Sequence, residues 1–268
     1  MDERPIGVFD SGIGGLTVLK EIMELLPGED IVYFGDTARI PYGTRSKETV
    51  IKYFFQSVKF LLTKDIKAIV IACNTASALA MEEAQEAFEI PMLGVIEPGA
   101  KAAVSATKNS IIGVIGTEGT INSQAYQRKI RKLLPSAEIV GIPCPLFVPI
   151  VEEGWESTDV AYLTAKKYLL ELKEHNIDSL VLGCTHYPAL RYTINKVLGD
   201  GVTLVNPAYE TARAARIMLK ERNLLSNKVE GGKCEFYVSD DPEKFKRSGG
   251  NMLRKEIASV QKVNIENL

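Results

Sequence analysis

Two short apolar segments, each leading into a cysteine in a small polar setting, constrain the fold of this chain most strongly. The first runs from Ala68 to Ala72 and precedes Cys73, and the second runs from Ser179 to Leu182 and leads through a glycine into Cys184. Apolar runs of this length without polar alternation are typical of strands covered on both faces of a parallel sheet. They predict an α/β fold with a cysteine just beyond the carboxyl end of two buried strands.

Helical and strand patterns alternate along nearly the whole chain. Apolar residues that recur every three to four positions predict amphipathic helices, the first of which is stopped by Pro27 and Gly28. This alternation favours mainly parallel sheets in a doubly wound arrangement. Further predicted strands and helices are Ile6–Phe9, Leu16–Leu26, Ile31–Phe34, Val50–Leu62, Ser110–Ile115 and a helix with Pro188 in its first turn.

The two halves of the chain resemble each other. Ile6–Phe9 is similar to Ile112–Ile115, and Ile71–Thr75 is similar to Leu182–His186. This similarity indicates an internal duplication, with two doubly wound domains that face each other and are related by pseudo-symmetry. Because ligands of open α/β sheets bind beyond the carboxyl ends of the strands, we expect an active-site cleft between the domains.

The duplication also predicts where the domains begin and end. We expect the first domain to comprise residues 1–97 and 209–268, and the second to comprise residues 98–208, with the first break near Pro98. The segment after about Tyr209 is too short to build a hydrophobic core of its own, so we expect it to return to the first domain. Each domain then carries one of the two cysteines.

Charge and composition exclude several classes of function. The 32 lysines and arginines nearly balance 34 acidic residues and no basic run occurs, so a nucleic-acid partner is not expected. No apolar stretch of signal-peptide length follows the charged N-terminus, and no run of about 18 apolar residues predicts a membrane span. We expect a cytoplasmic protein whose four cysteines are free thiols.

Two of the four cysteines have a setting that favours chemistry. A free cysteine is most often a packing residue, which is our interpretation of Cys144, between two prolines, and of Cys234, in a predicted edge strand. Cys73 and Cys184 instead follow their strands and precede small polar residues at a predicted helix N-terminus. The helix dipole lowers the pKa of a thiol at that position, so we expect these two side chains to react.

Two thiols that face each other across a cleft can invert a stereocentre. One thiolate removes a proton from a carbon atom on one face, and the opposite thiol delivers a proton to the other face. Thiols suit this exchange because their ordinary pKa of about 8.5 makes both protonation states accessible near neutral pH.

Acids and bases that tune the thiols are the next candidates. Asp10 ends the first strand, where an Asx-turn or a helix cap competes equally with a proton relay or an ammonium partner. His186 is one of only two histidines and stands two residues after Cys184, which favours a functional role. On sequence grounds alone, His175 is interpreted as a solvated or capping residue and Glu152 as a surface residue.

The glycine-rich loop Gly12–Gly15 does not fit the dinucleotide fingerprint, because Thr17 occupies the place of the third glycine. Its backbone amides are suited instead to a carboxylate. Polar residues at the other strand ends can bind the carboxylates of a small acid, although helix capping competes as the explanation for Thr117 and Thr120. The other residues of this polar set are Asn74, Thr75, Thr185 and His186.

Two cofactor-dependent interpretations are less favoured. Cys73, Cys184 and His186 come from distant loops that can share a zinc ion, but no close cysteine pair with the usual ligand spacing supports a metal site. Pyridoxal phosphate has no support, because no lysine stands beside a clear phosphate-binding loop. We therefore expect neither a metal nor a cofactor.

Six segments, spread in order over most of the chain, form a specific combination. They are Gly7–Leu16, Tyr33–Thr37, Pro41–Gly43, Ala72–Ala76, Gly116–Thr117 with Thr120, and Gly183–Pro188. Together they resemble the aspartate/glutamate racemase family, and within it the cofactor-independent glutamate racemases. His186 helps to separate this group from the related aspartate racemases, which usually carry glutamate there. One departure is Asn206-Pro207, where the family often has aspartate followed by serine or glycine.

The resemblance implies two facing α/β domains, a site in the cleft and roles for single residues. It implies that Cys73 deprotonates D-glutamate and Cys184 deprotonates L-glutamate, and that Asp10, Glu152 and His186 assist the thiols. Glu152 is carried over from a shorter match than the others. The residues implied to hold the substrate are Asp10, Ser11, Pro41, Tyr42, Gly43, Asn74, Thr75, Thr117, Thr120, Thr185 and His186.

The implied function is racemisation of L-glutamate to D-glutamate for bacterial peptidoglycan, by a protein that is a homodimer like most of the family. Two alternatives stay open. The first is racemisation of aspartate or another small acid by the same pair of thiols. The second is a non-catalytic amino-acid-binding protein of the same fold, against which the retention of both thiols speaks.

Overall fold

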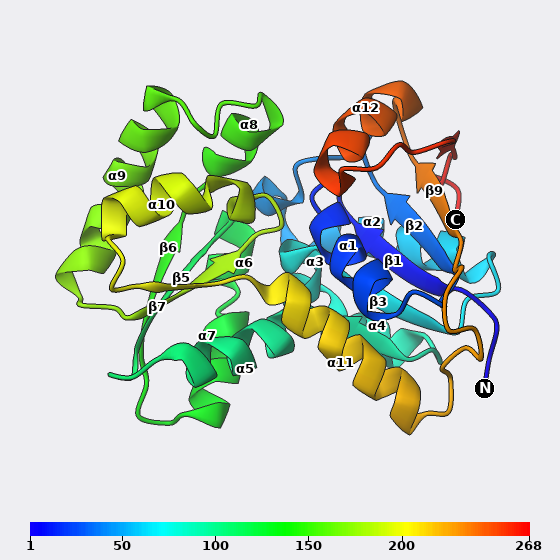
Figure 1. Ribbon diagram of the computed structural model, residues 1–268, viewed down its shortest axis with the longest axis horizontal. Coiled ribbons are helices and arrows are strands. Elements are labelled where there is room, and N and C mark those ends of the chain that lie inside the picture. The colour runs from blue at the N-terminus through cyan, green and yellow to red at the C-terminus, as the bar shows by residue number, and fades with distance from the viewer.

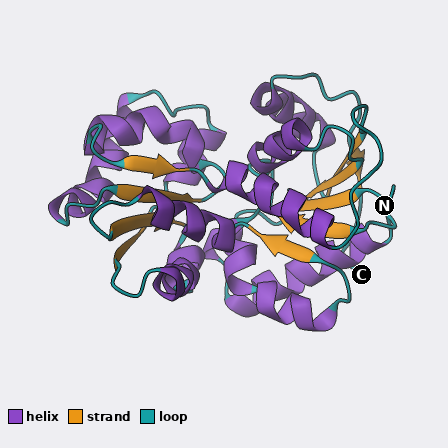
Figure 2. Cartoon of the chain, turned by 60° about the horizontal axis from the view of Figure 1, so that its bottom comes forward, coloured by secondary structure: helices purple, strands orange, loops and turns teal.

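A computed structural model describes all residues of the chain, 1–268, and contains two β-sheets that lie in separate halves of the molecule. Figure 1 shows the halves side by side, with both chain termini in the same half. Helices cover both sides of each sheet (Figure 2). This is the doubly wound α/β arrangement that the alternation in the sequence predicts.

The first sheet has six parallel strands in the order β10-β9-β2-β1-β3-β4. The chain returns at its C-terminal end to add β9 and β10. Cys234 begins β9, which lies between β2 and the two-residue β10, so the prediction that Cys234 is in an edge strand is wrong. The strands are β1 Ile6–Asp10, β2 Ile31–Gly35, β3 Ala68–Ile71, β4 Met92–Gly94, β9 Cys234–Val238 and β10 Gln261–Lys262.

The second sheet has four parallel strands in the order β6-β5-β7-β8, which repeats the order β2-β1-β3-β4 of the first sheet. The register repeats as well. Gly7 pairs with Ile69 and Gly113 pairs with Leu180, and in each case a cysteine follows the partner by four residues. The shared order and register support the duplication. These strands are β5 Ile111–Gly116, β6 Glu138–Pro143, β7 Ser179–Gly183 and β8 Thr203–Val205.

The helices follow the predicted pattern with local differences. Ser46 and Thr158 cap α2 and α9 through their side chains, as small polar residues do at helix starts. Pro188 lies in a 3-10 turn, η2, that precedes α10, so the predicted helix begins later than expected. Pro98 lies inside the continuous helix α5. None of the helices combines the length and the hydrophobicity that crossing a bilayer requires.

The helices packed on the first sheet are α1 Leu16–Leu25, α2 Lys47–Leu62, α3 Asn74–Leu79, α4 Met81–Ala87, α11 Pro207–Glu221 and α12 Pro242–Leu253, with the 3-10 turn η1 Tyr42–Thr44. Those of the second half are α5 Ile96–Ala106, α6 Glu118–Asn122, α7 Ala125–Leu133, α8 Phe147–Glu152, α9 Asp159–Glu174 and α10 Arg191–Leu198, with η2 Tyr187–Leu190.

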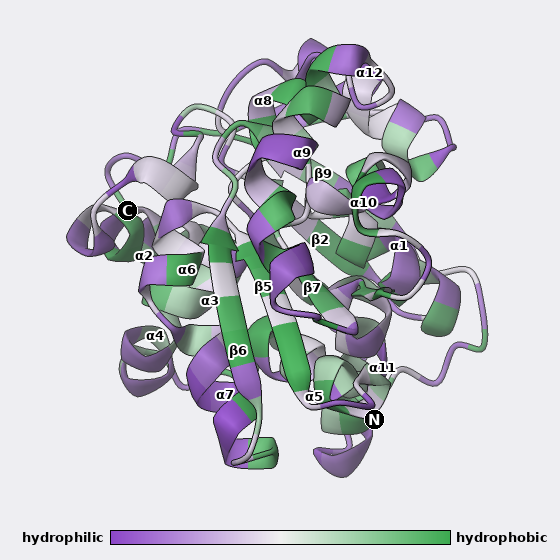
Figure 3. Ribbon diagram, turned by 90° about the vertical axis from the view of Figure 1, so that its left-hand side faces the viewer, coloured by the Kyte–Doolittle hydropathy of each residue, from purple (hydrophilic) through white to green (hydrophobic).

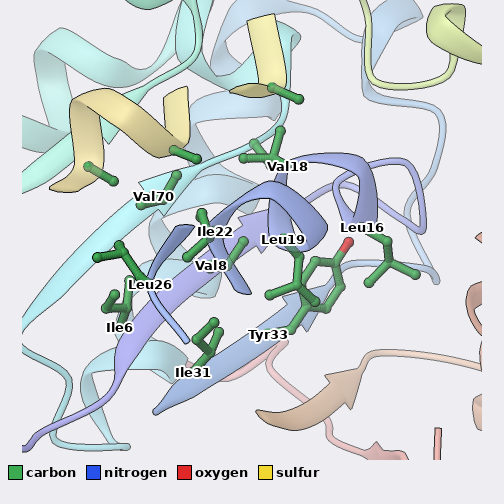
Figure 4. Close-up of a cluster of buried hydrophobic side chains, with 14 of the residues drawn as sticks. Ile6, Val8, Leu16, Val18, Leu19, Ile22, Leu26, Ile31, Tyr33 and Val70 are labelled. Atoms are coloured by element: carbon green, nitrogen blue, oxygen red, sulfur yellow. The ribbon is translucent and has the colours of Figure 1, made fainter. Parts of the chain in front are cut away.

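Each sheet carries a hydrophobic core on both faces. In the first half Val8 and Val70 point toward α1 and α11, and Figure 4 shows this cluster, whereas Phe9 points to the opposite face toward α2. In the second half Val114 and Ile115 divide in the same way between two clusters. Figure 3 shows the strands of this sheet as largely hydrophobic. Two covered faces hold each sheet rigid and fix the positions of its strand ends.

Candidate functional site

The two halves enclose a small cavity at the carboxyl edges of their sheets. Its volume is about 30 Å³, enough for a water molecule or two. Cys73 and Cys184 both line it, one from each half. The other lining residues are Ser11, Gly12, Ile40, Pro41, Tyr42, Gly43, Asn74, Thr75, Thr117, Val148, Glu152, Thr185 and His186.

Cys73 lies directly after β3 and is the N-cap residue of the short helix α3. Its thiol donates a hydrogen bond to the hydroxyl oxygen of Ser11 at 3.5 Å. Asp10 lies beside Ser11 with 1 % of its surface exposed. One carboxylate oxygen of Asp10 accepts the backbone N–H of Gly12 at 2.9 Å, as in an Asx-turn, and the other has no hydrogen-bond partner.

Burial dominates the chemistry of this half of the site. It raises the pKa of the Cys73 thiol to about 12, and the nearby charge of Asp10 acts in the same direction. Burial also raises the pKa of Asp10. The sequence predicts a lowered thiol pKa from the helix dipole, and this prediction is wrong for Cys73 because desolvation of the thiolate outweighs the dipole of a helix of six residues.

Cys184 has a different set of neighbours. Its sulfur lies 3.9 Å from Nδ1 of His186, and Nε2 of His186 lies 3.4 Å from Oε1 of Glu152, at ion-pair distance but without hydrogen-bond alignment. Glu152 ends α8 and keeps 31 % of its side chain exposed. The sequence predicts that Cys184 lies at the N-terminus of an α-helix. This prediction is wrong, because Cys184 precedes the 3-10 turn η2.

The contacts of His186 favour its charged form. Burial on its own lowers the pKa of this imidazole, but the contacts with Cys184 and Glu152 and the charges of Cys184 and Asp10 raise it to about 10. The contact with His186 in turn lowers the pKa of Glu152. This half of the site therefore places a cationic imidazole beside the Cys184 sulfur.

Polar residues join the two halves across the cavity. The hydroxyl oxygens of Thr75 and Thr117 are 2.9 Å apart, and Tyr126 donates to Oδ1 of Asn74 at 2.7 Å. Thr117 also caps α6 by accepting the backbone N–H of Thr120 at 3.2 Å. Thr117 thus both caps a helix and lines the cavity.

Glycines allow the halves to approach this closely. A Cβ on Gly14 would lie 2.2 Å from Oγ1 of Thr185 and 2.8 Å from Nδ1 of His186, and a Cβ on Gly43 would lie 2.5 Å from Cβ of Thr117. These contacts are shorter than atoms tolerate. The glycine-rich loop therefore brings the backbone of the first half against the polar residues of the second half.

The structure brings nearly all the residues expected at the site to the cavity. Asp10 and Thr120 do not line it, although Asp10 lies directly behind Ser11 and Thr120 contacts Thr117. Sequence reasoning missed Ile40 and Val148, which are apolar and have no distinguishing pattern. It also missed Tyr126, which donates to Asn74, and the buried Asp36, which accepts a hydrogen bond from the hydroxyl of Tyr42. Of these residues, only Asp36 lies in a segment that resembles the family.

The remaining cysteines and the second histidine lie outside the site. Cys144 is buried in the core of the second half, and Cys234 packs against the core of the first half. All four cysteines are free. His175 follows α9 at the surface, 3.3 Å from Oε1 of Glu138. Nowhere do three or more histidine, cysteine, aspartate or glutamate side chains gather as metal ligands do.

Comparisons with known proteins agree with this geometry. The sequence model of the Asp/Glu/hydantoin racemase family matches residues 6–215. A glutamate racemase from Geobacter metallireducens is 51% identical over 266 residues, which cover 99% of this chain and 98% of that protein. The crystal structure of glutamate racemase isoform RacE1 from Bacillus anthracis superposes with a TM-score of 0.95, at 41% identity and over 98% of both chains.

A second solved structure is a glutamate racemase from Francisella tularensis in complex with D-glutamate, which superposes with a TM-score of 0.93 at 44% identity over 100% of both chains. The family match covers most of the chain, and the relatives match at full length. The chain therefore belongs to the Asp/Glu/hydantoin racemase family, in which it groups with the glutamate racemases, and it is an isomerase.

Proposed function

We propose that this protein racemises glutamate, with Cys73 and Cys184 as a pair of acid and base that act on opposite faces of Cα. The observation that carries the proposal is that one free, buried cysteine from each half lines a single cavity. The choice of glutamate is supported by relatives named glutamate racemase and by a structural neighbour that holds D-glutamate.

In the direction from L- to D-glutamate, the Cys184 thiolate takes the Cα proton. The Cα–H bond breaks, an S–H bond forms, and the electron pair is delocalised into the adjacent carboxylate. The Cys73 thiol then gives its proton to the other face of Cα and becomes the thiolate. The reverse reaction exchanges the two roles, so no proton is gained or lost overall and no cofactor takes part.

The surrounding residues divide between the two thiols. His186, with Glu152 behind it, stabilises the thiolate of Cys184, and Asp10 assists Cys73 through the Ser11 side of the cavity. We assign substrate binding to polar groups of both halves. These are Asp10, Ser11, Pro41, Tyr42, Gly43, Asn74, Thr75, Thr117, Thr120, Thr185 and His186.

The biological setting follows from this activity. We propose that the D-glutamate supplies peptidoglycan synthesis in the cytoplasm and that the active protein is a homodimer. We also propose that residues 1–97 with 209–268 and residues 98–208 are the two domains that move relative to each other when substrate enters. The two sheets, one on each side of the cavity, support this division.

Hydrogen exchange in heavy water tests the function. Either enantiomer of glutamate is expected to gain deuterium at Cα while it racemises, and replacement of either cysteine by alanine is expected to stop racemisation. Aspartate is assayed in parallel, because faster turnover of aspartate would favour the alternative substrate. Binding of glutamate without any exchange at Cα would contradict the proposal and favour an amino-acid-binding protein.

A further inference from the structure

The cavity around the cysteines raises the question of how substrate reaches it. A volume of about 30 Å³ is far too small for glutamate, so the halves must separate or their side chains must move to admit it. Two larger hollows adjoin this cavity and share lining residues with it. The inference below rests on the proposed function, in which the substrate is an anion with two carboxylates.

The first hollow, which we call the α8–α12 hollow, has a volume of about 170 Å³. It shares Gly12, Ile40 and Glu152 with the cavity and is closed on its far side by residues of α12, including Lys244 and Phe245. Figure 1 shows α8 and α12 at the top of the two halves. Glu152 and Lys244 thus stand on opposite sides of the boundary between the halves.

The second hollow has a volume of about 260 Å³ and shares six lining residues with the cavity: Ile40, Pro41, Gly43, Thr117, Val148 and Glu152. The charged residues that line it are Glu118 and Glu152, both acidic. An anionic substrate that enters there meets two carboxylates and no cation. Electrostatic repulsion therefore disfavours this route.

Lys244 is the cation that distinguishes the α8–α12 hollow. Three acids line the same hollow: Glu152, Asp240, which pairs with Lys262 at 2.6 Å, and Asp241, whose side chain caps α12 by accepting the backbone N–H of Lys244 at 2.9 Å. Lys244 is exposed and forms no ion pair within 4.0 Å, so its ammonium group is free to meet a carboxylate.

The packing of the neighbouring residue holds Lys244 in position. Its neighbour Phe245 is 1 % exposed and packs against Tyr33 with ring centroids 5.7 Å apart, which anchors α12 to the first half. Across the hollow, the positive charge of Lys244 adds to the contact with His186 in lowering the pKa of Glu152. Lys244 is therefore close enough to influence a charge at the entrance of the cavity.

We propose that the α8–α12 hollow is the passage to the cysteines and that Lys244 attracts the anionic substrate into it. Lys244 takes no part in proton transfer under this proposal. Its effect belongs to capture of the substrate, and it is expected in KM and in the dependence of the rate on salt rather than in kcat.

Steady-state racemisation of L- and D-glutamate by Lys244→Gln, Lys244→Glu and Lys244→Arg tests the passage. Lys244→Gln is expected to raise KM about two- to fivefold and Lys244→Glu about five- to twentyfold, with kcat within about twofold of the wild type. Lys244→Arg is expected to restore the wild-type KM. The decline of kcat/KM with added salt is expected to be shallower in Lys244→Gln than in the wild type.

Lys255→Gln is the matched control, because Lys255 is exposed, follows α12 and lines a different hollow on that helix. A KM for Lys244→Gln equal to that of the wild type, an equal rise in Lys255→Gln, or failure of Lys244→Arg to restore KM overturns the proposal. If the wild-type chain itself does not exchange the Cα hydrogen of glutamate, the proposed function has failed instead.

Discussion

The two halves of the molecule share a strand order and a register but surround their cysteines with different chemistry. Cys73 has the hydroxyl of Ser11 and the buried carboxyl of Asp10 as neighbours, whereas Cys184 has an imidazole backed by a carboxylate. The shared order and register place the two sulfurs at equivalent positions, whereas the residues around them differ. Equivalent positions in a repeat need not carry equivalent chemistry.

This difference matches the needs of a proton exchange. Burial raises the pKa of the Cys73 thiol to about 12, while His186, whose pKa is raised to about 10, lies beside Cys184. Under the proposed mechanism one side then begins as an acid and the other as a base.

The largest expected effect comes from removing either sulfur. Cys73→Ser and Cys184→Ser are each expected to lower the rate of racemisation about 100- to 10,000-fold in both directions, because a hydroxyl replaces the thiol as acid and base. Initial rates measured by polarimetry check this. Cys234→Ser, which changes a cysteine outside the cavity, is the control and is expected to keep the wild-type rate. Wild-type activity in either of the first two variants would show that the halves do not act as a pair.

The two halves also differ at the amino ends of their strands, on the side of each sheet away from the site. Lys67, just before β3, forms a fully buried ion pair with Glu29, whereas Asp178, just before β7, accepts hydrogen bonds from Thr107 and two backbone N–H groups. Lys67→Met is expected to lower the free energy of unfolding by about 3–5 kcal/mol, because it leaves a buried carboxylate unpaired.

For Asp178→Asn the expected loss of unfolding free energy is smaller, about 1–2 kcal/mol, because the side chain keeps one acceptor oxygen. Denaturant unfolding followed by circular dichroism checks both values. The double replacement Lys67→Met with Glu29→Leu is expected to recover most of the loss. An equal or larger loss in Asp178→Asn would contradict the comparison of the two edges.

The close approach of the two halves at Gly14 can be disrupted by adding one methyl group. Gly14→Ala places a Cβ against Thr185 and His186, and overpacking of this kind costs about 1–3 kcal/mol. We expect kcat/KM for glutamate to fall about fivefold to a hundredfold, since that energy opposes closure of the site. Gly201→Ala, where no atom lies within 4 Å of the new Cβ, is the control. Equal kcat/KM values for both variants would show that close approach at Gly14 is not required.

The smallest expected effect is a difference in the dependence of stability on pH. The pKa of His186 is raised to about 10, above the ordinary value of about 6.5, so the folded protein binds this proton more tightly than the unfolded chain. The stabilisation is complete below about pH 6.5 and is lost as the pH rises through about 10.

Between pH 7 and pH 9, the free energy of unfolding of the wild type is therefore expected to fall more than that of His186→Gln, by on the order of 1 kcal/mol. Urea unfolding at a series of pH values measures this difference. Parallel curves for the two proteins would mean that His186 is not charged in the folded state.

Much of the fold was predictable because local patterns of apolar residues indicate its strands and helices. The apolar runs before Cys73 and Cys184 and the repeated segments predicted parallel sheets in two halves, and the structure and the family confirm this. The edge position of Cys234 was wrong because the pairing of the distant β10 with β9 leaves no local signal. The 3-10 turn at Pro188 likewise depends on packing near the site rather than on the pattern of that segment.

The site was less predictable than the fold. Cys73, Cys184 and His186 stand out from their positions at strand ends, but nothing local marks Val148 or Tyr126 as neighbours of the cavity. The pKa of Cys73 could not be predicted from its helix, because the burial that raises it depends on the packing of distant segments of the chain. The pKa of a group in a cleft depends on the residues that bury it.

The most direct test of the account is a crystal structure of the protein with glutamate bound. We expect the sulfurs of Cys73 and Cys184 to lie on opposite faces of Cα, each about 3–3.5 Å from it and therefore roughly 6–8 Å apart. Both sulfurs on one face of Cα, or one of them separated from the substrate by other side chains, would contradict inversion by a pair of thiols.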